Sequence, residues 1–205
     1  TGPGNTGVTN GTLLPIVNPS LYGGASQLIK TGTGTATLAG NNSYEGLTTV
    51  SQGTLVAASA TALGTAATGT EVASGATLVL SGGFTFAGES LTFRQIVNSA
   101  LRAELRSLGG TSPWTGALQS VGKAPVLLNA AGGDLILTNN LDLGRSQLTV
   151  DGGFNTFIGG AIPQVGGGKQ FDFSADSPSA QGLSLVGTAA LVSNRLRLTP
   201  NTANN

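Results

Sequence analysis

Three aspartates and one arginine that lie close together in the sequence are the residues best suited to catalysis. They are Asp134, Asp142, Arg145 and Asp151, and the first and last of them, 17 residues apart, would stack if the chain coiled with about that period. Enzymes that cleave polysaccharides need carboxylates and a basic group that converge on one face. All four residues, however, stand at Gly or Asn bends, where Asp serves the turn itself. We therefore favour turn formation, and keep catalysis and weak cation binding as alternatives.

The run Gly166-Gly167-Gly168-Lys169 suggests a phosphate-binding loop. That motif, G-x-x-x-x-G-K-[ST], requires Gly at position 163 and Ser or Thr at position 170. The chain has Pro163 and Gln170 instead, so the motif fails. We interpret residues 163–169 as a flexible linker.

The residues that the sequence lacks exclude whole classes of chemistry. The chain has no Cys, which removes disulfides, thiolate metal sites and Cys nucleophiles, and no His, the commonest general base and metal ligand. Its nine basic and nine acidic residues cancel, so no basic field exists to hold nucleic acid. No apolar stretch approaches the roughly 18 residues of a membrane helix. The sequence therefore predicts no cofactor, no nucleic-acid partner, no membrane insertion by this segment and no enzymatic activity.

The composition is typical of a turn-rich all-β protein. Gly accounts for 33 of the 205 residues, about twice its usual share, and charged residues for only 9%, against about 25% in ordinary domains. From Leu28 to Gly64, runs of a few Thr, Val and Leu residues alternate with glycine-containing turns. No run is long enough to form a core alone. Such strands become stable by stacking on copies of themselves, as in a β-solenoid.

Two segments depart from this pattern. Near the start, we expect a strand at 12–17 that leads into the first turn of the solenoid and covers its open end. Residues 93–108, FRQIVNSALRAELRSL, hold three of the nine basic residues and good helix formers, with apolar residues near helical spacing. We expect a short loop or helical excursion over 94–103, followed by a strand from residue 104.

An aromatic residue followed two positions later by Gly recurs four times. The pairs are Tyr44 and Gly46, Phe86 and Gly88, Trp114 and Gly116, and Phe157 and Gly159. Their spacings of 42, 28 and 43 residues fit coil turns of about 20 residues with insertions. We expect the aromatic residues to pack along the solenoid, with stacking on carbohydrate as the alternative for Tyr44 and Trp114. At Gly46 and Gly116 we expect bends that a β-branched residue cannot adopt.

Thirteen residues near the start of the chain follow a regular pattern of apolar, glycine and polar positions. They are Leu28, Lys30, Gly32, Gly34, Leu38, Gly40, Asn42, Tyr44, Gly46, Thr48, Val50, Gly53 and Leu55. They match the run L-x-K-x-G-x-G-x-x-x-L-x-G-x-N-x-Y-x-G-x-T-x-V-x-x-G-x-L, so the segment resembles the passenger-associated transport repeat of large bacterial surface proteins. The resemblance implies a right-handed parallel β-helix that is secreted, usually as part of an adhesin or another surface protein.

The resulting division of the chain is a lead-in over 1–27, a solenoid over 28–162, the linker and a tail over 170–205. The tail positions Phe171, Phe173, Leu183, Gly187, Ala189, Leu191, Leu196, Leu198 and Thr199 resemble the opening strands of a bacterial L-type, legume-like lectin domain. The calcium- and sugar-binding residues of that family lie further downstream, so none is carried over.

The apolar side chains of the tail form a predicted association surface. They are Phe171, Phe173, Leu183, Leu185, Leu191, Leu196 and Leu198, and they would be costly if left in water. We expect them to pack along the chain's own solenoid or onto a neighbouring copy as a donated strand.

These patterns favour a structural or adhesive β-helical segment of a large extracellular bacterial protein, acting as a stalk, scaffold or filament-forming unit. Because the chain begins with Thr1 and carries no signal peptide, we expect a piece of a longer protein. The expected partners are a second copy in a head-to-tail filament, and a cell-surface glycan or matrix. The alternatives are a carbohydrate-binding adhesin, through the lectin-like tail, and a polysaccharide-degrading β-helix enzyme.

Overall fold

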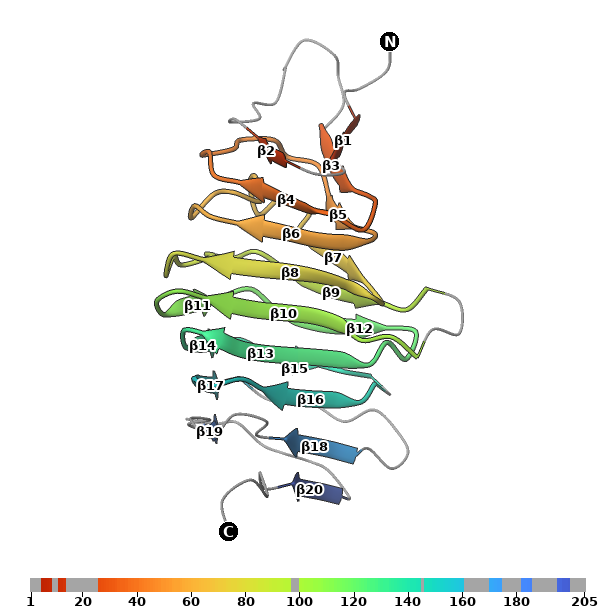
Figure 1. Cartoon of the computed structure of the whole chain (residues 1–205), viewed down its shortest axis with the longest axis vertical. Coiled ribbons are helices and arrows are strands. Elements are labelled where there is room, and N and C mark those ends of the chain that lie inside the picture. Colours follow the sequence, from red (N-terminus) through yellow and green to blue (C-terminus); the bar gives the residue numbers. More distant parts are fainter. Residues whose placement is uncertain are drawn as a thin grey trace.

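A computed structural model of the chain shows a stack of parallel β-strands (Figure 1). It describes residues 26–96, 100–144 and 146–160, and the backbone of strands 5–8, 11–13, 170–174, 182–185 and 195–199. Every regular element in these ranges is a strand, and every pairing between named strands is parallel. The predicted fold class, an all-β parallel β-solenoid, is confirmed.

Three sheets run along the stack. The first contains β1 (Asn5–Val8), β3 (Gln27–Lys30), β5 (Thr48–Val50), β7 (Thr70–Ala73), β9 (Leu91–Arg94), β12 (Leu118–Val121) and β15 (Leu141–Asp142). The second contains β2 (Gly11–Leu13), β4 (Thr35–Leu38), β6 (Gly53–Ala57), β8 (Ala76–Ser81), β10 (Ala103–Leu108), β13 (Val126–Gly132), β16 (Leu148–Asp151), β18 (Gln170–Ser174) and β20 (Arg195–Thr199). The third contains β11 (Ser112–Trp114), β14 (Leu135–Leu137), β17 (Asn155–Ile158) and β19 (Gly182–Leu185).

The core consists of columns of equivalent side chains, one from each turn. In the second sheet, the column Leu55, Leu78, Leu105 and Leu128 is in register through four successive strands, and all four side chains are fully buried. Neighbours in this column are 23 or 27 residues apart, which agrees with the expected turns of about 20 residues with insertions. Burying one leucine contributes about 2 kcal/mol. Stacking therefore supplies the neighbours that a five-residue strand such as β6 lacks by itself.

The expected excursion after β9 is a loop in the residues that the structure describes. β9 ends at Arg94 and β10 begins at Ala103, one residue before the predicted start. Residues 95–96 and 100–102 have no regular structure, and 97–99 lie outside the described residues. The apolar spacing suggested a helix, but Leu105 belongs to strand β10, where it is buried, and Leu101 is largely exposed. The described ranges contain no helix suited to crossing a membrane.

The described strands of the tail pair in register with the rest of the solenoid. β18 pairs with β16, β19 with β17 and β20 with β18. Six of the seven predicted association residues stand on these strands: Phe171, Phe173, Leu183, Leu185, Leu196 and Leu198. This pairing corresponds to packing along the chain's own solenoid, and the lectin resemblance finds no support in it. Leu191 and the linker lie outside the described residues, as does most of the predicted strand at 12–17.

Close approach between successive turns explains the glycines at two of the predicted bends. Neither Gly46 nor Gly116 has a positive φ angle. A Cβ atom on Gly46 would overlap the carbonyl oxygen of Ser26 in the preceding turn, and one on Gly116 would overlap the main chain of Glu89. Glycine is needed at these bends because of packing against backbone, and the alternative of backbone strain does not apply.

We expect Gly116→Ala to destabilise the protein by about 3 kcal/mol, because its Cβ would force two turns apart. Urea unfolding followed by circular dichroism measures the loss. The control is Gly88→Ala, where φ is 71° but the nearest atom to an added Cβ is 3.7 Å away. Backbone strain alone should cost about 1 kcal/mol there. Equal losses at the two positions would show that close approach does not select the glycine at position 116.

Candidate functional site

Lys30 is a buried cation at the bend between β3 and β4. Its side chain is fully buried, in register with Val50 of the next turn. Its Nζ atom donates to the carbonyl oxygens of Thr31 at 2.8 Å, Gly32 at 2.7 Å and Gln52 at 2.9 Å. All three N–H donors are therefore used, and two successive turns are joined. Burial lowers the pKa of Lys30 from its ordinary value.

The glycines that accompany Lys30 let these bends stack. Gly32 and Gly53 have positive φ angles of 71° and 70°. A Cβ atom on Gly53 would overlap the carbonyl oxygen of Gly32 and lie 2.5 Å from that of Gly34. The structure thus brings together four of the repeat positions that the sequence singled out.

Tyr44 and Asn42 are buried in the loop between β4 and β5. This loop lies on the third side of the stack, where regular strands begin only at β11. The hydroxyl of Tyr44 shares a 2.6 Å hydrogen bond with Thr48, and Asn42 Nδ2 donates to the carbonyl of Ala62 at 2.6 Å. Burial raises the pKa of Tyr44. Because no part of Tyr44 is exposed, its ring offers no face for stacking on a sugar. A Cβ atom on Gly64 would lie 2.8 Å from that ring, so glycine is required there.

Phe86 and Trp114 are equivalent residues of neighbouring turns. They form a parallel β-bridge, and their rings stack with centroids 5.5 Å apart and an interplanar angle of 21°. Trp114 is fully buried and Phe86 nearly so. The pair is therefore part of the core, and the carbohydrate-stacking alternative fails for Trp114.

The register corrects the prediction for the fourth aromatic pair. Trp114 stands opposite Leu137, and Leu137 stands opposite Ile158, so Phe157 is displaced by one residue. A one-residue displacement moves a side chain to the other face of the strand, and Phe157 is half-buried as a result. The glycine packed against the preceding turn is correspondingly Gly160, not Gly159.

The aspartates considered for catalysis accept hydrogen bonds from the main chain, Asp142 and Asp151 within their own bends and Asp134 from the next turn. Their Oδ1 atoms accept from main-chain N–H groups: Asp134 from Asn155 at 2.9 Å, Asp142 from Gly144 at 2.9 Å and Asp151 from Gly152 at 2.8 Å. The expected stacking of Asp134 on Asp151 is wrong, because Asp151 is in register with Asn129. Arg145 lies outside the described residues. Within those residues, no acidic cluster is suited to holding a metal ion.

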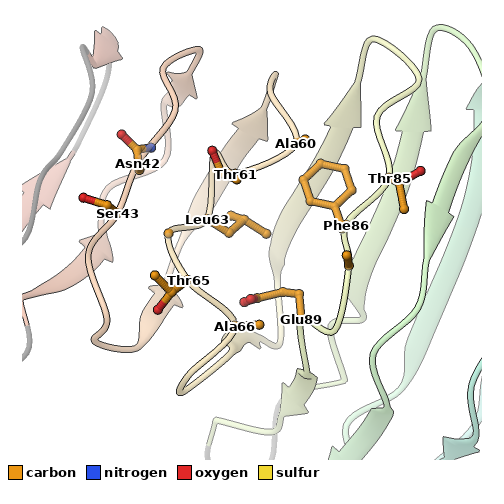
Figure 2. A pocket seen from close by; sticks show the side chains of 12 residues that line it. Asn42, Ser43, Ala60, Thr61, Leu63, Thr65, Ala66, Thr85, Phe86 and Glu89 are labelled. Atoms are coloured by element: carbon orange, nitrogen blue, oxygen red, sulfur yellow. The ribbon is translucent and has the colours of Figure 1, made fainter.

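A hollow of about 300 Å³ lies on the third side of the stack, between loops of three successive turns (Figure 2). Residues 42–43, 60–61, 63–66, 85–87 and 89 contribute to its lining. It forms where these turns have loops, before the regular third sheet begins at β11. Glu89 is the one ionisable residue in this lining, and no basic residue belongs to it.

Glu89 is a buried carboxyl group with unused hydrogen-bonding capacity. It is only 5% exposed, and its Oε1 atom accepts a hydrogen bond from Thr70 at 2.7 Å. Its other oxygen has no partner among the described residues, and neither ion pair found there, Arg94 with Glu71 or Arg106 with Glu104, includes it. Burial raises the pKa of Glu89 to about 7, despite the opposing effect of Thr70.

One comparison with known proteins identifies part of the chain. The passenger-associated-transport-repeat family matches residues 28–57, the segment from the second residue of β3 to the end of β6. The predicted resemblance to the autotransporter repeat is thereby confirmed for this segment. Comparisons with curated proteins and with solved structures gave no match.

Sequence reasoning missed Glu89 and its hydrogen-bond donor Thr70. No motif surrounds Glu89, and the two residues come together only because the stack brings positions 19 apart into contact. The one available signal was composition: the chain has only nine acidic residues, so each of them was worth considering as a functional or structural group.

Replacing Lys30 by Met should destabilise the protein by about 2 kcal/mol, because three carbonyl oxygens lose their donor while the apolar stem is retained. Urea unfolding measures the change. The control is Lys123→Met at an exposed lysine, which should change stability by less than about 0.5 kcal/mol. A Lys30 variant as stable as this control would mean that the cost of burying the ammonium cancels its hydrogen bonds.

The raised pKa of Glu89 should make its contribution to stability greatest in acid. The carboxyl titrates near 4.5 when unfolded and about 7 when folded. The contribution is fully present below the unfolded pKa, is lost as the pH rises to about 7, and is constant above it, a change of about 3 kcal/mol. We expect the difference in unfolding free energy between the natural protein and Glu89→Gln to follow this curve. The same substitution at exposed Glu45 should show no such transition, and a flat difference for Glu89→Gln would contradict the assignment.

Proposed function

We propose that this chain is part of the passenger domain of a bacterial autotransporter, where it serves as a rigid spacer at the cell surface. The observation that carries the proposal is the match of residues 28–57 to the passenger-associated transport repeat, in a chain whose later turns stack on that repeat in register. The family match supports a secreted or surface-exposed location.

The physical character of the stack suits a spacer. Each turn adds about 4.8 Å of length, the spacing of hydrogen-bonded strands. The core columns and the stacked bends fix each turn on the one before it, so the molecule resists bending without needing disulfides, which a chain lacking Cys cannot form. Low charge, 9% of residues, limits repulsion between adjacent turns.

A non-catalytic role is part of the proposal. It is supported by the hydrogen bonds that Asp134, Asp142 and Asp151 accept from main-chain N–H groups, which are a structural use of these carboxylates. Adhesion to a glycan or matrix and head-to-tail filament formation remain predictions for the longer protein. The parallel pairing of β18 and β20 within one chain favours a folded-back tail over a donated strand.

The spacer role can be tested by placing the chain between a signal peptide and an outer-membrane translocator barrel in a Gram-negative bacterium, with an epitope at its outer end. We expect antibody to label the epitope on intact cells and added protease to leave the folded segment uncut. The control is the same fusion with Gly116→Ala, which should be displayed less or cleaved more. Retention of the natural segment inside the cell, or release of sugars from polysaccharides by the purified chain, would contradict the proposal.

A further inference from the structure

The hollow beside Glu89 has the chemical character of a site for a small cationic ligand. A single carboxyl group provides its only possible charge, and no basic residue lies in the lining to attract an anion. Ser43, Thr61 and Thr85, all exposed, also contribute to its lining, and Leu63 adds apolar surface. Figure 2 shows the Glu89 side chain reaching from the loop of Phe86 toward the neighbouring loop of Ala66.

Two polar atoms at this hollow are left without partners inside the protein. One oxygen of Glu89 receives no hydrogen bond from any described residue, although its side chain is 95% buried, and Thr65 Oγ1 is buried without a partner. Thr65 Oγ1 is among the buried side-chain atoms that lack a partner, and the free oxygen of Glu89 is not, so that oxygen is open to solvent in the hollow. It is therefore within reach of a ligand, whose donor would supply the hydrogen bond that the chain does not.

We propose that this hollow binds a small ligand through a primary ammonium group, which donates hydrogen bonds to the free oxygen of Glu89. An ammonium group has three donors and no acceptor, so it complements a carboxylate and a hydroxyl oxygen together. Charge-assisted hydrogen bonds of this kind are about twice as strong as neutral ones. The volume of about 300 Å³ is at the lower limit for ligand pockets and suits an alkylammonium or a single amino sugar.

The binding should depend on pH through Glu89. The carboxyl group must be ionised to pair with an ammonium, and its pKa of about 7 means that much of it is neutral in the free protein below that pH. Tyr44 is the one other titratable group in the described residues that interacts with Glu89, and its raised pKa keeps it neutral throughout this range. Affinity should therefore rise about tenfold per pH unit below 7 and level off above it.

The test is an NMR titration of the isotopically labelled chain with n-butylammonium and with n-butanol, which has the same shape but no charge. At pH 8 and physiological salt, we expect saturable shifts of the Glu89, Thr70 and Ala66 amides with butylammonium, at an affinity of about 1 mM, and at least tenfold weaker binding of butanol.

Variants localise the binding. Glu89→Gln should weaken butylammonium binding at least tenfold, and Ala66→Leu, which places a larger side chain in the lining of the hollow, should weaken it too. Glu45→Gln removes a nearby exposed carboxylate and should leave binding unchanged. Equal binding of butanol, unchanged binding in Glu89→Gln, or no saturable shifts up to about 100-fold above the expected dissociation constant of about 1 mM would overturn the proposal. Any of these results would leave the spacer role unaffected.

Discussion

Parallel hydrogen bonding between one turn of the chain and the next is the constraint on which the rest of the structure depends. A strand of three to five residues has no stability alone, so each must find its equivalent in the neighbouring turn. Register then decides every side chain's direction, as the buried column from Leu55 to Leu128 illustrates. The same spacing brings bends into contact, and Gly46 and Gly116 occur where a Cβ atom has no room.

The chain has few charged residues, and two that are buried, Lys30 and Glu104, form hydrogen bonds that join successive turns. Lys30 binds carbonyl groups of two turns, and Glu104, mostly buried on the second sheet, accepts hydrogen bonds from Thr77, Arg106 and Asn129. These three residues lie on β8, β10 and β13, so one carboxylate joins three successive turns. These polar side chains thus hold successive turns together. Glu89 differs because only one of its two carboxyl oxygens accepts a hydrogen bond from a described residue.

Much of the fold could be predicted because its signals are local. Short Thr- and Val-rich runs between glycines predict strands, and the repeat spacing around Lys30 and Tyr44 predicts their stacking. What failed depended on register, which a sequence with insertions of variable length does not specify. Phe157 was placed one residue out of phase, and Asp134 was paired with Asp151 although the strands place Asn129 there. The Glu89 hollow was unpredictable for the same reason, because three loops of unequal length create it.

The contacts of each turn with only its neighbours have a mechanical consequence. A force that pulls the ends apart along the long axis is carried by every interface between turns, but a terminal turn has a neighbour on one side only and is released first. A released turn of 23 residues, such as that between Leu55 and Leu78, exchanges about 5 Å of rod for up to about 75 Å of extended chain. A tether built in this way lengthens under load and keeps its remaining turns intact, so it absorbs tension before it breaks.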